Sequence, residues 1–564
     1  MKNWIKKENV GASLLEREQE LFSDFKNARA NSSSYKIKNT DTVISCIKDA
    51  INHNYPIRIV GDYDVDGVCS TSELKFLLIA LGAKESNLDY YLPKRFTDGY
   101  GISMKIVDNF LFTVEKDKGL LITVDNGIVA KDAIKKAKSL GWKVIIIDHH
   151  QPEVVDGKVS LPAADLIIDP HAIKGSSNFE DYCAGGLVYK IAQTANLSTE
   201  TLNLIKSFAM MATVCDVVKL IEEIGGHYVY DNYIIVKEGL QSILQNNGRT
   251  TGLYCLLRAL GLDYSVSESE IGFIVGPVIN AAARLNDTGA QYVFEFLTKN
   301  DNNFSEADEI ANILIENNKT RKKMTSDIMP ILIERIASNN QQNDYPLLVL
   351  GKPDEIGEGL IGLIAGKISE EYSTICAVLT PVGDGLLKGS FRGPEGSRIK
   401  NLLDSCKDYL VAYGGHDAAG GFSLKEENFE KFKQCITAAA GKKPETVTNA
   451  YYDYTISTDE VADNLNLLDK YAPFGAGHTI PIYKIENFTA QLRRGVYYSV
   501  LGKGSVFKIH SKKADLINFT GEGEAMYKAI GKPINMDVIG TLRYNVWNGN
   551  KYFQIAFKEL LKRP

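Results

Sequence analysis

Four short runs of β-branched and other apolar residues in the first third of the chain each end directly before an acidic residue. Stretches with helical spacing, such as 72–81 and 130–140, lie between them. Strands that are apolar on both faces and joined by helical crossovers form a parallel sheet covered on both sides. The four runs are Ile57–Val60, Leu120–Val124, Val144–Ile147 and Leu166–Ile168. The sequence therefore predicts an α/β fold built on a parallel sheet.

The residues that follow these runs are polar and suited to metal binding. They are Gly61-Asp62-Tyr63-Asp64-Val65-Asp66-Gly67, Asp125-Asn126-Gly127, Asp148-His149-His150 and Asp169-Pro170. The carboxyl ends of parallel strands meet at one crevice, so these side chains converge there. Clustered carboxylates need a cation, and carboxylate with imidazole but no thiolate suits Mg²⁺ or Mn²⁺. A pair of such ions serves phosphodiester hydrolysis. Any single Asp-containing loop is more often structural, but three motifs in order favour a site.

Composition limits the classes that need to be considered. The 564 residues exceed one hydrophobic core, so about three or four domains are expected. A net charge of −6 excludes a generally basic nucleic-acid coat but allows a local basic groove. The eight cysteines form no C-x-x-C pair and support neither zinc pairs nor a disulfide framework. With no signal peptide and no long apolar run, we expect a cytoplasmic protein.

The pattern along the chain suggests a multidomain organisation. A long charged helix is expected over 304–337, followed by a second α/β segment that begins with the strand Leu347–Leu350. The tail has alternating strands and an Asn548-Gly549 hairpin signal, which favour a small barrel of oligonucleotide-binding (OB) type. The tail strands are expected at Val506–Ile509, Leu516–Phe519, Val538–Tyr544 and Tyr552–Phe557. The expected parts are a helical extension at 1–50, a catalytic domain at 51–300, a connecting helix at 301–342, a second α/β domain at 343–442 and a barrel at 450–564.

Three of the strand-end motifs resemble the signatures of the DHH phosphoesterase superfamily: Gly61–Gly67, Val124–Gly127 and Asp148–His150. The form Gly-Asp-Tyr-Asp-x-Asp-Gly, followed by Leu92–Arg95 and Asp98–Gly101, resembles its RecJ branch. The resemblance covers about 40–560 in family order. Further matches lie at 213–218, 276–277 with 280–282, 358–359 with 362, 389–392, 414–416 with 418–420, and 473–477. The resemblance makes the second α/β segment the DHH-associated domain.

The resemblance implies a 5′-to-3′ exonuclease on single-stranded DNA that uses two Mn²⁺ or Mg²⁺ ions. It implies that Asp64, Asp125, His149 and Asp216 hold the tighter ion, and that Asp62 with bridging Asp125 holds the second. It also implies that His150 faces the scissile phosphate, while Asp66 and Asp148 orient the ligands. Asp216 lies in a helical stretch and would not be found from the strand pattern. Asp169 matches no family ligand and is expected to be structural.

The expected phosphate clamp lies mainly in the second α/β segment. Arg392 offers a planar fork, Ser390 a hydroxyl, and the Gly414-Gly415-His416 turn backbone amides. Similar residues in RecJ hold the substrate backbone and its 5′ phosphate. Arg95, Asn280 and Arg284 are further substrate-binding residues implied by the matching motifs. Taken alone, Arg392 would more often be an ordinary surface arginine.

Aromatic residues give the barrel a plausible strand-binding face, although aromatics on barrel strands are more often core. The binding candidates are Tyr544, Trp547, Tyr552 and Phe553, with Arg543, Lys551 and Lys558 near phosphates. Departures from the family pattern at Val278, Gly357 and Gly393 bear on substrate grip rather than on hydrolysis.

The favoured hypothesis is a monomeric exonuclease that releases 5′-mononucleotides in DNA repair and recombination. A single-strand-binding protein and a helicase are partners that the family suggests. The alternative is a DHH phosphodiesterase acting on short oligonucleotides, cyclic dinucleotides or pyrophosphate, and the tail argues against it. A degenerate scaffold protein is a third class, which the intact set of acidic and histidine residues disfavours.

Overall fold

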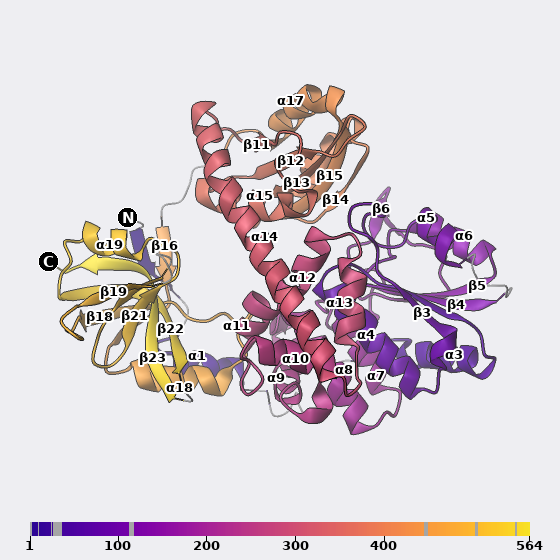
Figure 1. Ribbon diagram of the computed structural model, residues 1–564, viewed down its shortest axis with the longest axis horizontal. Coiled ribbons are helices and arrows are strands. Elements are labelled where there is room, and N and C mark those ends of the chain that lie inside the picture. The colour runs from indigo at the N-terminus through magenta and orange to yellow at the C-terminus, as the bar shows by residue number, and fades with distance from the viewer. Residues whose placement is uncertain are drawn as a thin grey trace. The chain divides into compact units, whose positions relative to one another are not determined.

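The computed structural model describes residues 3–8, 11–23, 25, 36–111, 118–444, 449–501, 506–547 and 550–563. The chain forms two compact units (Figure 1). The larger unit consists of Lys36–Val218 and Ile234–Thr446. The smaller unit combines Met1–Tyr35, Lys219–Tyr233 and Val447–Pro564. The five-part division expected from the sequence stays a prediction.

The larger unit contains the predicted parallel sheet. Its strand order is β3 (Leu88–Tyr91), β2 (Ile57–Val60), β4 (Gly119–Val124), β5 (Trp142–Ile147) and β8 (Leu166–Ile168), and all neighbours are parallel. The four strands predicted from apolar runs are confirmed. The sequence did not indicate β3, because this edge strand is only partly buried and lacks a continuous apolar run.

Helices cover both faces of this sheet, as the crossovers require (Figure 1). On one face, α6 (Lys131–Ser139) packs with Ile134 against Leu121, Val144 and Ile146. On the other face lie α3 (Thr40–Asn52), α4 (Val65–Ala80) and α7 (Ala184–Gln193). Helix α4 is buried along most of its length because α7 and α8 (Thr199–Cys215) pack over it. The ends of the strands are thus held in a rigid layer.

A long helix links the two α/β parts of the larger unit. Helix α14 (Phe304–Ser338) matches the predicted span, and its buried residues recur at three- and four-residue intervals. Its first half packs on α10 (Thr251–Ala259) and α12 (Gly276–Leu285). Its second half places Ile328, Leu332 and Ile336 in the core of the next sheet. One continuous helix therefore contributes to both cores.

The second sheet of the larger unit is mixed. The strand order is β11 (Leu347–Leu350), β12 (Cys376–Pro381), β13 (Leu386–Arg392), β15 (Ala419–Lys425) and β14 (Ala412–Gly415), with only β11 and β12 parallel. Helix α15 (Ile361–Tyr372) covers one face, and α16 (Ile399–Ser405) and α17 (Phe429–Ala440) cover the other. The expected second α/β domain is confirmed.

The structure pairs Cys406 with Cys435 as a disulfide, which the sequence analysis did not expect. Cys406 ends α16 and Cys435 lies on α17, and their Cα atoms are 5.9 Å apart. The two helices pack side by side on the sheet, which brings together residues 29 positions apart. No local spacing motif indicates such a pair.

The smaller unit is built on a seven-stranded sheet in the order β17-β18-β22-β23-β21-β20-β19. The bounds are β17 (Tyr454–Ser457), β18 (Tyr483–Thr489), β19 (Tyr498–Leu501), β20 (Val506–Ile509), β21 (Asp515–Asn518), β22 (Asn535–Trp547) and β23 (Asn550–Lys562). About five strands were expected, and the described residues form seven. The predicted hairpin signal at 548–549 lies outside the described residues.

The N-terminal region differs from the helical extension that was expected. Residues Asn3–Lys6 form β1, which pairs in parallel with β16 (Asn449–Tyr452). Helix α1 (Leu14–Leu21) follows, and α3 belongs to the larger unit. The strand β1 depends on a partner more than 440 positions away, so local pattern could not reveal it. Among the described residues, no helix is both long and apolar enough to cross a bilayer.

Candidate metal and phosphate site

The loop between β2 and α4 carries three of the predicted acidic residues. A Cβ at Gly67 would come within 2.5 Å of the Asp62 backbone, and one at Gly61 would overlap the Thr71 hydroxyl. Only glycine allows this close return of the chain. Asp64 is the N-cap of α4, and its carboxylate accepts a hydrogen bond from the Gly67 N–H at 3.2 Å. The loop therefore points Asp62 and Asp64 into the same crevice.

Asp66 lies in the first turn of α4 and is held by the start of another helix. Its carboxylate accepts hydrogen bonds from the N–H groups of Ala184 at 2.7 Å and Gly185 at 2.8 Å, in the first turn of α7. Burial, and then the neighbouring Asp64, raise the pKa of Asp66 to about 6. This arrangement fits the orienting role that was predicted for Asp66.

The loop after β4 is fixed by a residue to which the sequence analysis assigned no role. Asp125 has a left-handed backbone with φ of 61°. Beside it, the Asn126 amide donates hydrogen bonds to the carbonyls of Val60, Gly61 and Val124 at 2.9–3.1 Å. Its carbonyl accepts from the Ile102 N–H at 3.0 Å. Asn126 thus ties the ends of β2 and β4 together.

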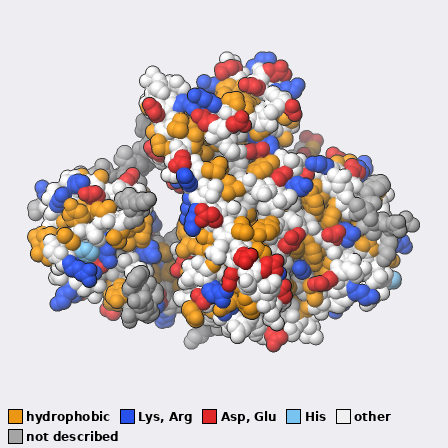
Figure 2. Space-filling view, in the orientation of Figure 1, with side chains coloured by type: hydrophobic (Ala, Val, Ile, Leu, Met, Phe, Trp, Pro, Cys, Tyr) orange, Lys and Arg blue, Asp and Glu red, His pale blue; other side chains and the backbone are white. Residues whose placement is uncertain are grey.

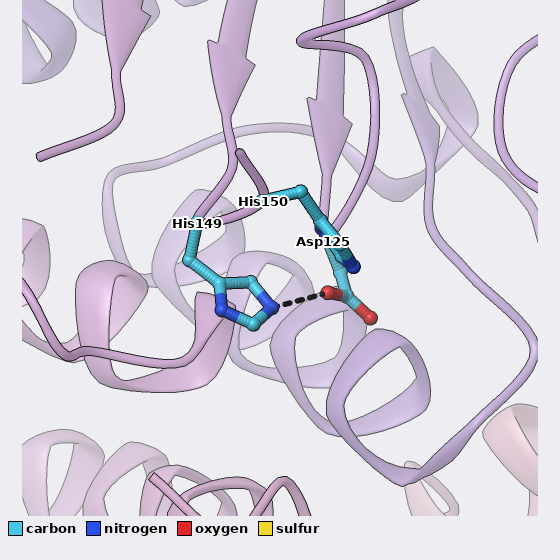
Figure 3. A group of neighbouring side chains, drawn as sticks. All are labelled: Asp125, His149 and His150. Carbon is cyan, nitrogen blue, oxygen red and sulfur yellow. Dashed lines mark hydrogen bonds and ion pairs between the residues drawn. The ribbon is translucent and has the colours of Figure 1, made fainter. Parts of the chain in front are cut away.

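Asp148, at the end of β5, orients both histidines that follow it. Its carboxylate accepts hydrogen bonds from the His149 N–H at 2.8 Å and from the Ile128 N–H at 2.9 Å. Its Oδ1 also lies 2.7 Å from His150 Nδ1. The His149 ring then reaches Asp125, with Nε2 3.2 Å from Oδ1 (Figure 3). The predicted support by Asp148 is thus directed at His150, and His149 points to the acidic cluster.

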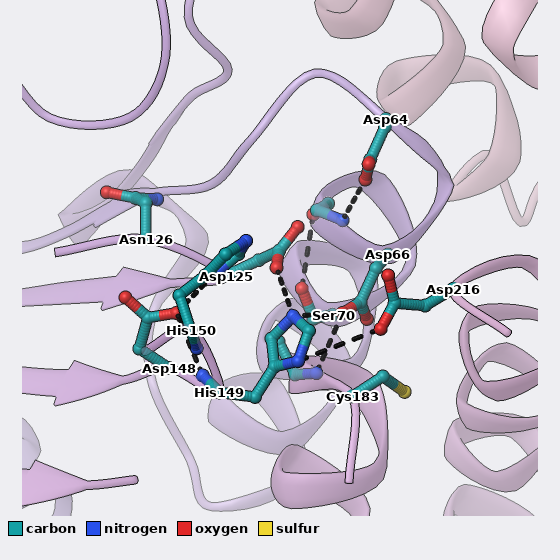
Figure 4. A network of polar contacts seen from close by, with 12 residues as sticks. Asp64, Asp66, Ser70, Asp125, Asn126, Asp148, His149, His150, Cys183 and Asp216 are labelled. Atoms are coloured by element: carbon teal, nitrogen blue, oxygen red, sulfur yellow. Dashed lines mark hydrogen bonds and ion pairs between the residues drawn. The ribbon is translucent and has the colours of Figure 1, made fainter. Parts of the chain in front are cut away.

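Asp216 joins the cluster from the C-terminal end of α8, where it is the C-cap. Its Oδ2 is 3.7 Å from His149 Nδ1, and His149 Nε2 is 3.6 Å from Asp66 Oδ2 (Figure 4). Helix α8 packs along α4, which carries Asp64 and Asp66, and this packing brings Asp216 in. Strand pattern alone gave no sign of it, because the residue ends a helix rather than a strand.

The described residues contain three sets of side chains that lie within reach of one cation. In each set, ligand atoms lie within 4.8 Å of one another. The sets are Asp62, Asp64 and Asp125; Asp66, His149 and Asp216; and Asp125, His149 and His150. The Asp62 Oδ1 atom is buried without a hydrogen-bond partner. Burial, and then mutual repulsion, raise the pKa values of Asp62, Asp125 and Asp216 well above the usual range. Such crowded oxygens with imidazole nitrogen fit divalent cations such as Mn²⁺ or Mg²⁺.

The two histidines differ sharply in their affinity for protons. Burial, and then the neighbouring His150, lower the pKa of His149 to about 3, so His149 is a neutral, ligand-competent imidazole. Burial opposes the charge on His150, but the Asp148 carboxylate outweighs it and raises the pKa of His150 to about 9. His150 is therefore an imidazolium at neutral pH. The Tyr100 hydroxyl donates to the Asp125 carbonyl at 2.8 Å and lies 3.1 Å from His150 Nδ1.

A cluster of arginines lies in the same unit, close enough to the acidic residues for Arg284 to interact with Asp64 and Arg95 with Asp62. Burial, and then the nearby Arg95, Arg321 and Arg392, lower the pKa of Arg284 to about 9. Burial, and then Arg95, also lower the pKa of Arg392. Crowded guanidinium groups of this kind favour a bound anion. The sequence analysis predicted Arg95, Arg284 and Arg392 as substrate-binding residues. It missed Arg321, because that residue lies among other charged residues on α14.

One contact of these arginines joins the two α/β parts of the larger unit, and the others are local. Arg95 stacks over the Tyr63 ring, with its guanidinium carbon 4.5 Å from the ring centroid. Arg284, on α12, donates to the Gly359 carbonyl at 3.2 Å. Arg392, on β13, donates to the Ser390 hydroxyl at 2.9 Å. Figure 2 shows acidic and basic side chains mixed on the viewed face of the molecule.

Of the other predicted clamp residues, His416 and the Gly414-Gly415 turn lie beside His150, and Asn280 lies on α12. The His416 ring stacks on His150 at 5.6 Å between centroids, and Gly414 and Gly415 are exposed beside it on β14. Asn280 is partly buried on α12. Among the departures from the family pattern, Val278 is buried on α12, and Gly393 has no space for a Cβ beside Ser397. Gly357 has open space around it.

In the smaller unit, the Tyr544 ring is partly buried, so it offers less surface for stacking on a base than an exposed ring would. Its ring packs against the core and lies beneath Lys551 Nζ at 4.5 Å, and its hydroxyl lies 3.4 Å from Asn466 Oδ1. The side chain of Trp547 lies outside the described residues. Tyr552, which is 51% exposed, lines a hollow of about 520 Å³. The hollow is lined by Arg493, Lys508, Ser511, Lys512, Lys513, Asp515, Asn545, Tyr552 and Phe553.

Comparisons with known proteins match both units. Residues 56–214 match the N-terminal domain of the DHH family, and residues 452–559 match the RecJ OB domain. The single-stranded-DNA-specific exonuclease RecJ of Bacillus subtilis is 28% identical over 533 residues, which is 93% of this chain. The chain spans 64% of the length of that relative.

Solved structures of RecJ proteins have a similar fold. The crystal structure of RecJ in complex with Mn²⁺ from Thermus thermophilus matches 94% of this chain and 72% of its own, with a TM-score of 0.74 and 23% identity. A crystal structure of exonuclease RecJ bound to manganese matches 73% of this chain and 98% of its own, with a TM-score of 0.58 and 26% identity.

The parallel sheet, and most of its carboxylate–histidine cluster, lie in the part of the chain that matches the N-terminal domain of the DHH family. Residues 452–559 match the RecJ OB domain, and the chain is similar to RecJ exonucleases over most of its length, at 28% identity to the Bacillus subtilis relative. The chain's multidomain α/β architecture, with the long helix, the second mixed sheet and the C-terminal OB domain, is confirmed.

Proposed function

We propose that the chain is a metal-dependent exonuclease that degrades single-stranded DNA from the 5′ end to 5′-mononucleotides. The observation that carries the proposal is the pairing of two features in one unit. An acidic and histidine cluster suited to divalent cations lies in the same unit as arginines suited to an anion. The relatives are single-stranded-DNA-specific exonucleases by name. A terminal phosphate held by the arginines would fix both the end that is recognised and the bond that is cut.

The cation ligands in this proposal are the predicted ones. Asp64, Asp125, His149 and Asp216 would hold one ion, and Asp62 with Asp125 would hold the other. The structure groups Asp64 with Asp62 and Asp125, and it groups His149 and Asp216 with Asp66. When bound, such ions polarise phosphoryl oxygens and make water more acidic. Neutral His149 and the crowded carboxylates provide that binding set without further proton loss from the imidazole. Asp66 and Asp148 act as positioning residues, since each is fixed by backbone N–H groups.

The chain's own groups then assist hydrolysis. Water adds to the phosphorus, the bond to the 3′ oxygen breaks, and a 5′-mononucleotide leaves. The His150 imidazolium stabilises the charge that develops on the phosphoryl oxygens, and the Tyr100 hydroxyl and His416 ring hold it in place. Arg95, Arg284 and Arg392, with Ser390, grip the terminal phosphate. Asn280 and the Gly414-Gly415 turn are assigned to the adjoining backbone.

The smaller unit is assigned to the rest of the strand. Tyr552 and the basic side chains of the hollow offer one stacking surface and several phosphate contacts. Tyr544 and Trp547 remain candidates for further base contacts. This surface supports a polynucleotide substrate over the second candidate, a DHH phosphodiesterase on short oligonucleotides or cyclic dinucleotides. A role in DNA repair and recombination, a monomeric state, a cytoplasmic location, and partners such as a single-strand-binding protein and a helicase complete the proposal.

The decisive assay uses 5′- and 3′-labelled single strands, a duplex and a dinucleotide, each with Mn²⁺, Mg²⁺ or chelator. We expect the single strand to be shortened from its 5′ end only when metal is present. Rapid cleavage of the dinucleotide with no action on long strands would instead support the second candidate. No hydrolysis of any substrate with saturating Mn²⁺ would refute both.

A matched pair of variants tests the site itself. Asp125→Asn keeps the size of the side chain and tolerates the left-handed backbone, but it removes the bridging charge. We expect a loss of turnover of at least about a thousandfold with an unchanged melting temperature. Arg258→Gln, at an exposed ion pair with Asp308, is the control and should retain wild-type activity.

A further inference from the structure

The helix that carries two of the proposed substrate contacts has one open face. Helix α12, in the larger unit, holds Asn280 and Arg284. From 275 to 284, every residue is buried except Pro277, Asn280 and Arg284. Their spacing of three and four residues places them on the same face of the helix. Because Arg284 lies close enough to Asp64 to interact with it, this open face borders the acidic cluster.

The open face continues into the turn that precedes α12. Residues Ile271–Val275 form a turn of π-helix, in which Ile271 and Val275 are buried. Phe273 lies four positions before Pro277 and is 78% exposed, so it extends the row of open residues beyond the start of α12. A single exposed ring is ordinary on a protein surface, and it is the position of this ring that carries the argument.

The same turn packs against the end of α8, where Asp216 is the C-cap. A Cβ at Gly276 would lie only 2.6 Å from Cys215 Sγ, so this approach requires glycine. Cys215 Sγ is also 3.9 Å from the Ile271 carbonyl oxygen. Phe273 therefore belongs to a turn that contacts the residue next to a proposed metal ligand.

These contacts give the open face a direction. Arg284, which we assign to the terminal phosphate, lies at one end, and Phe273 lies at the other end, beside the helix that carries Asp216. A rise of about 1.5 Å per residue puts about 16 Å between Phe273 and Arg284 along the helix axis. This length corresponds to roughly five stacked nucleotides, or to fewer in a stretched strand. A strand that is held at Arg284 and cut at the acidic cluster would reach Phe273 with a base on the 3′ side of the cut.

We propose that Phe273 stacks on a base of the DNA strand on the 3′ side of the scissile phosphate and so retains the strand between successive cuts. An aromatic ring stacks on any base, so this contact is independent of sequence. The phenyl ring cannot bind a cation through a lone pair or move a proton, so its role is in binding long strands and not in breaking the bond. The proposal rests on the proposed function, because it takes the strand to run from the arginines past the acidic cluster.

The first test compares kinetics on a long single strand and on a dinucleotide, both 5′-phosphorylated, with the full chain and Mn²⁺. For the long strand, we expect Phe273→Ala to raise KM about fivefold or more and to leave kcat nearly unchanged. The kcat/KM for the dinucleotide should not change, because a dinucleotide is too short to reach the ring. Tyr264→Ala is the matched control, since the Tyr264 ring is 90% exposed in the same unit but lies outside the row of open residues on α12.

The second test detects the stacking directly, in chelator so that the strand stays intact. The fluorescent base 2-aminopurine is placed at successive positions from the 5′ end, and its fluorescence falls where a ring stacks on it. We expect quenching at a position beyond the second nucleotide, lost in Phe273→Ala and Phe273→Leu and retained in Phe273→Trp. The leucine variant keeps an apolar side chain without a flat ring, and the tryptophan variant keeps the flat ring. Thermal unfolding monitors each fold, and Phe273→Leu replaces Phe273→Ala in the kinetic test if the alanine variant does not fold.

Each outcome bears on one claim or on both. Wild-type KM for the long strand in Phe273→Ala, with unchanged quenching, would overturn the stacking role and leave the proposed function intact. Equal losses in Phe273→Ala and Tyr264→Ala would also overturn it, because any exposed ring would then have the same effect. An equal loss on the dinucleotide would place Phe273 at the cut itself and contradict its position on the 3′ side. A wild-type protein that cuts no strand would overturn the proposed function and this inference together.

Discussion

The proton on His150 depends on one carboxylate. With Asp148 at 2.7 Å, the pKa of His150 is about 9, so the imidazolium persists at neutral pH and is lost as the pH rises through 9. In Asp148→Asn the attractive charge is gone and burial dominates, which lowers the pKa. We expect the alkaline limb of the pH–rate profile, measured at saturating Mn²⁺, to move down by about one pH unit or more. An unchanged limb would show that His150 does not act as a cation.

Glu73 is a buried acid that the proposed mechanism does not use. Among the described residues, neither of its carboxyl oxygens has a hydrogen-bond partner. Burial, and then the neighbouring Asp66, raise the pKa of Glu73 well above the usual range. The folded state therefore keeps a proton that the unfolded chain releases. Stability is full below the unfolded pKa and falls as the pH rises.

Replacing this group should stabilise the fold. We expect Glu73→Met to raise the free energy of unfolding by about 1–3 kcal/mol at pH 8 and by less at pH 5. Denaturant unfolding at both pH values measures the difference. Glu370→Met, at an exposed position, is the control and should show no such dependence on pH. Destabilisation of Glu73→Met at both pH values would indicate a partner that the carboxyl requires.

At the scale of elements, the Asn126 side chain joins the ends of β2 and β4 through hydrogen bonds. It makes four hydrogen bonds with buried backbone groups, and its loss would leave several carbonyls unsatisfied. We expect Asn126→Ala to lower the free energy of unfolding by about 2–4 kcal/mol and to weaken Mn²⁺ binding through displacement of Asp125. Chemical denaturation and metal titration test this. A change of less than about 0.5 kcal/mol would contradict the role of Asn126.

The elements that the sequence predicted share a strong local signal. The apolar runs of β2, β4, β5 and β8 reflect strands that are buried in a covered sheet. The helical spacing of the apolar residues in α14 reflects the side of that helix that is buried. The exposed edge strand β3 and the parallel pair of β1 with β16 carry no such signal. Asp216 was found only through the family resemblance, because a helix C-cap carries no pattern of its own. Arg321 and Asn126 required the three-dimensional arrangement.

For the whole molecule, the largest gap between sequence and structure concerns which segments pack together. The smaller unit collects three separate stretches of chain, including 219–233 from between two helices of the larger unit. Local periodicity reports burial but not the identity of the partner. The disulfide between Cys406 and Cys435 was missed for the same reason, since the two helices meet only in the folded domain.

The arginine cluster has a practical consequence for handling the protein. Arg95, Arg284, Arg321 and Arg392 repel one another when nothing neutralises them. Inorganic phosphate or sulfate from a buffer should therefore occupy the cluster, raise the melting temperature by a few degrees, and compete with DNA ends. Arg284→Gln should reduce this buffer effect, as thermal scans in phosphate and in chloride would reveal. Rates of the proposed nuclease reaction measured in phosphate buffer would then be too low.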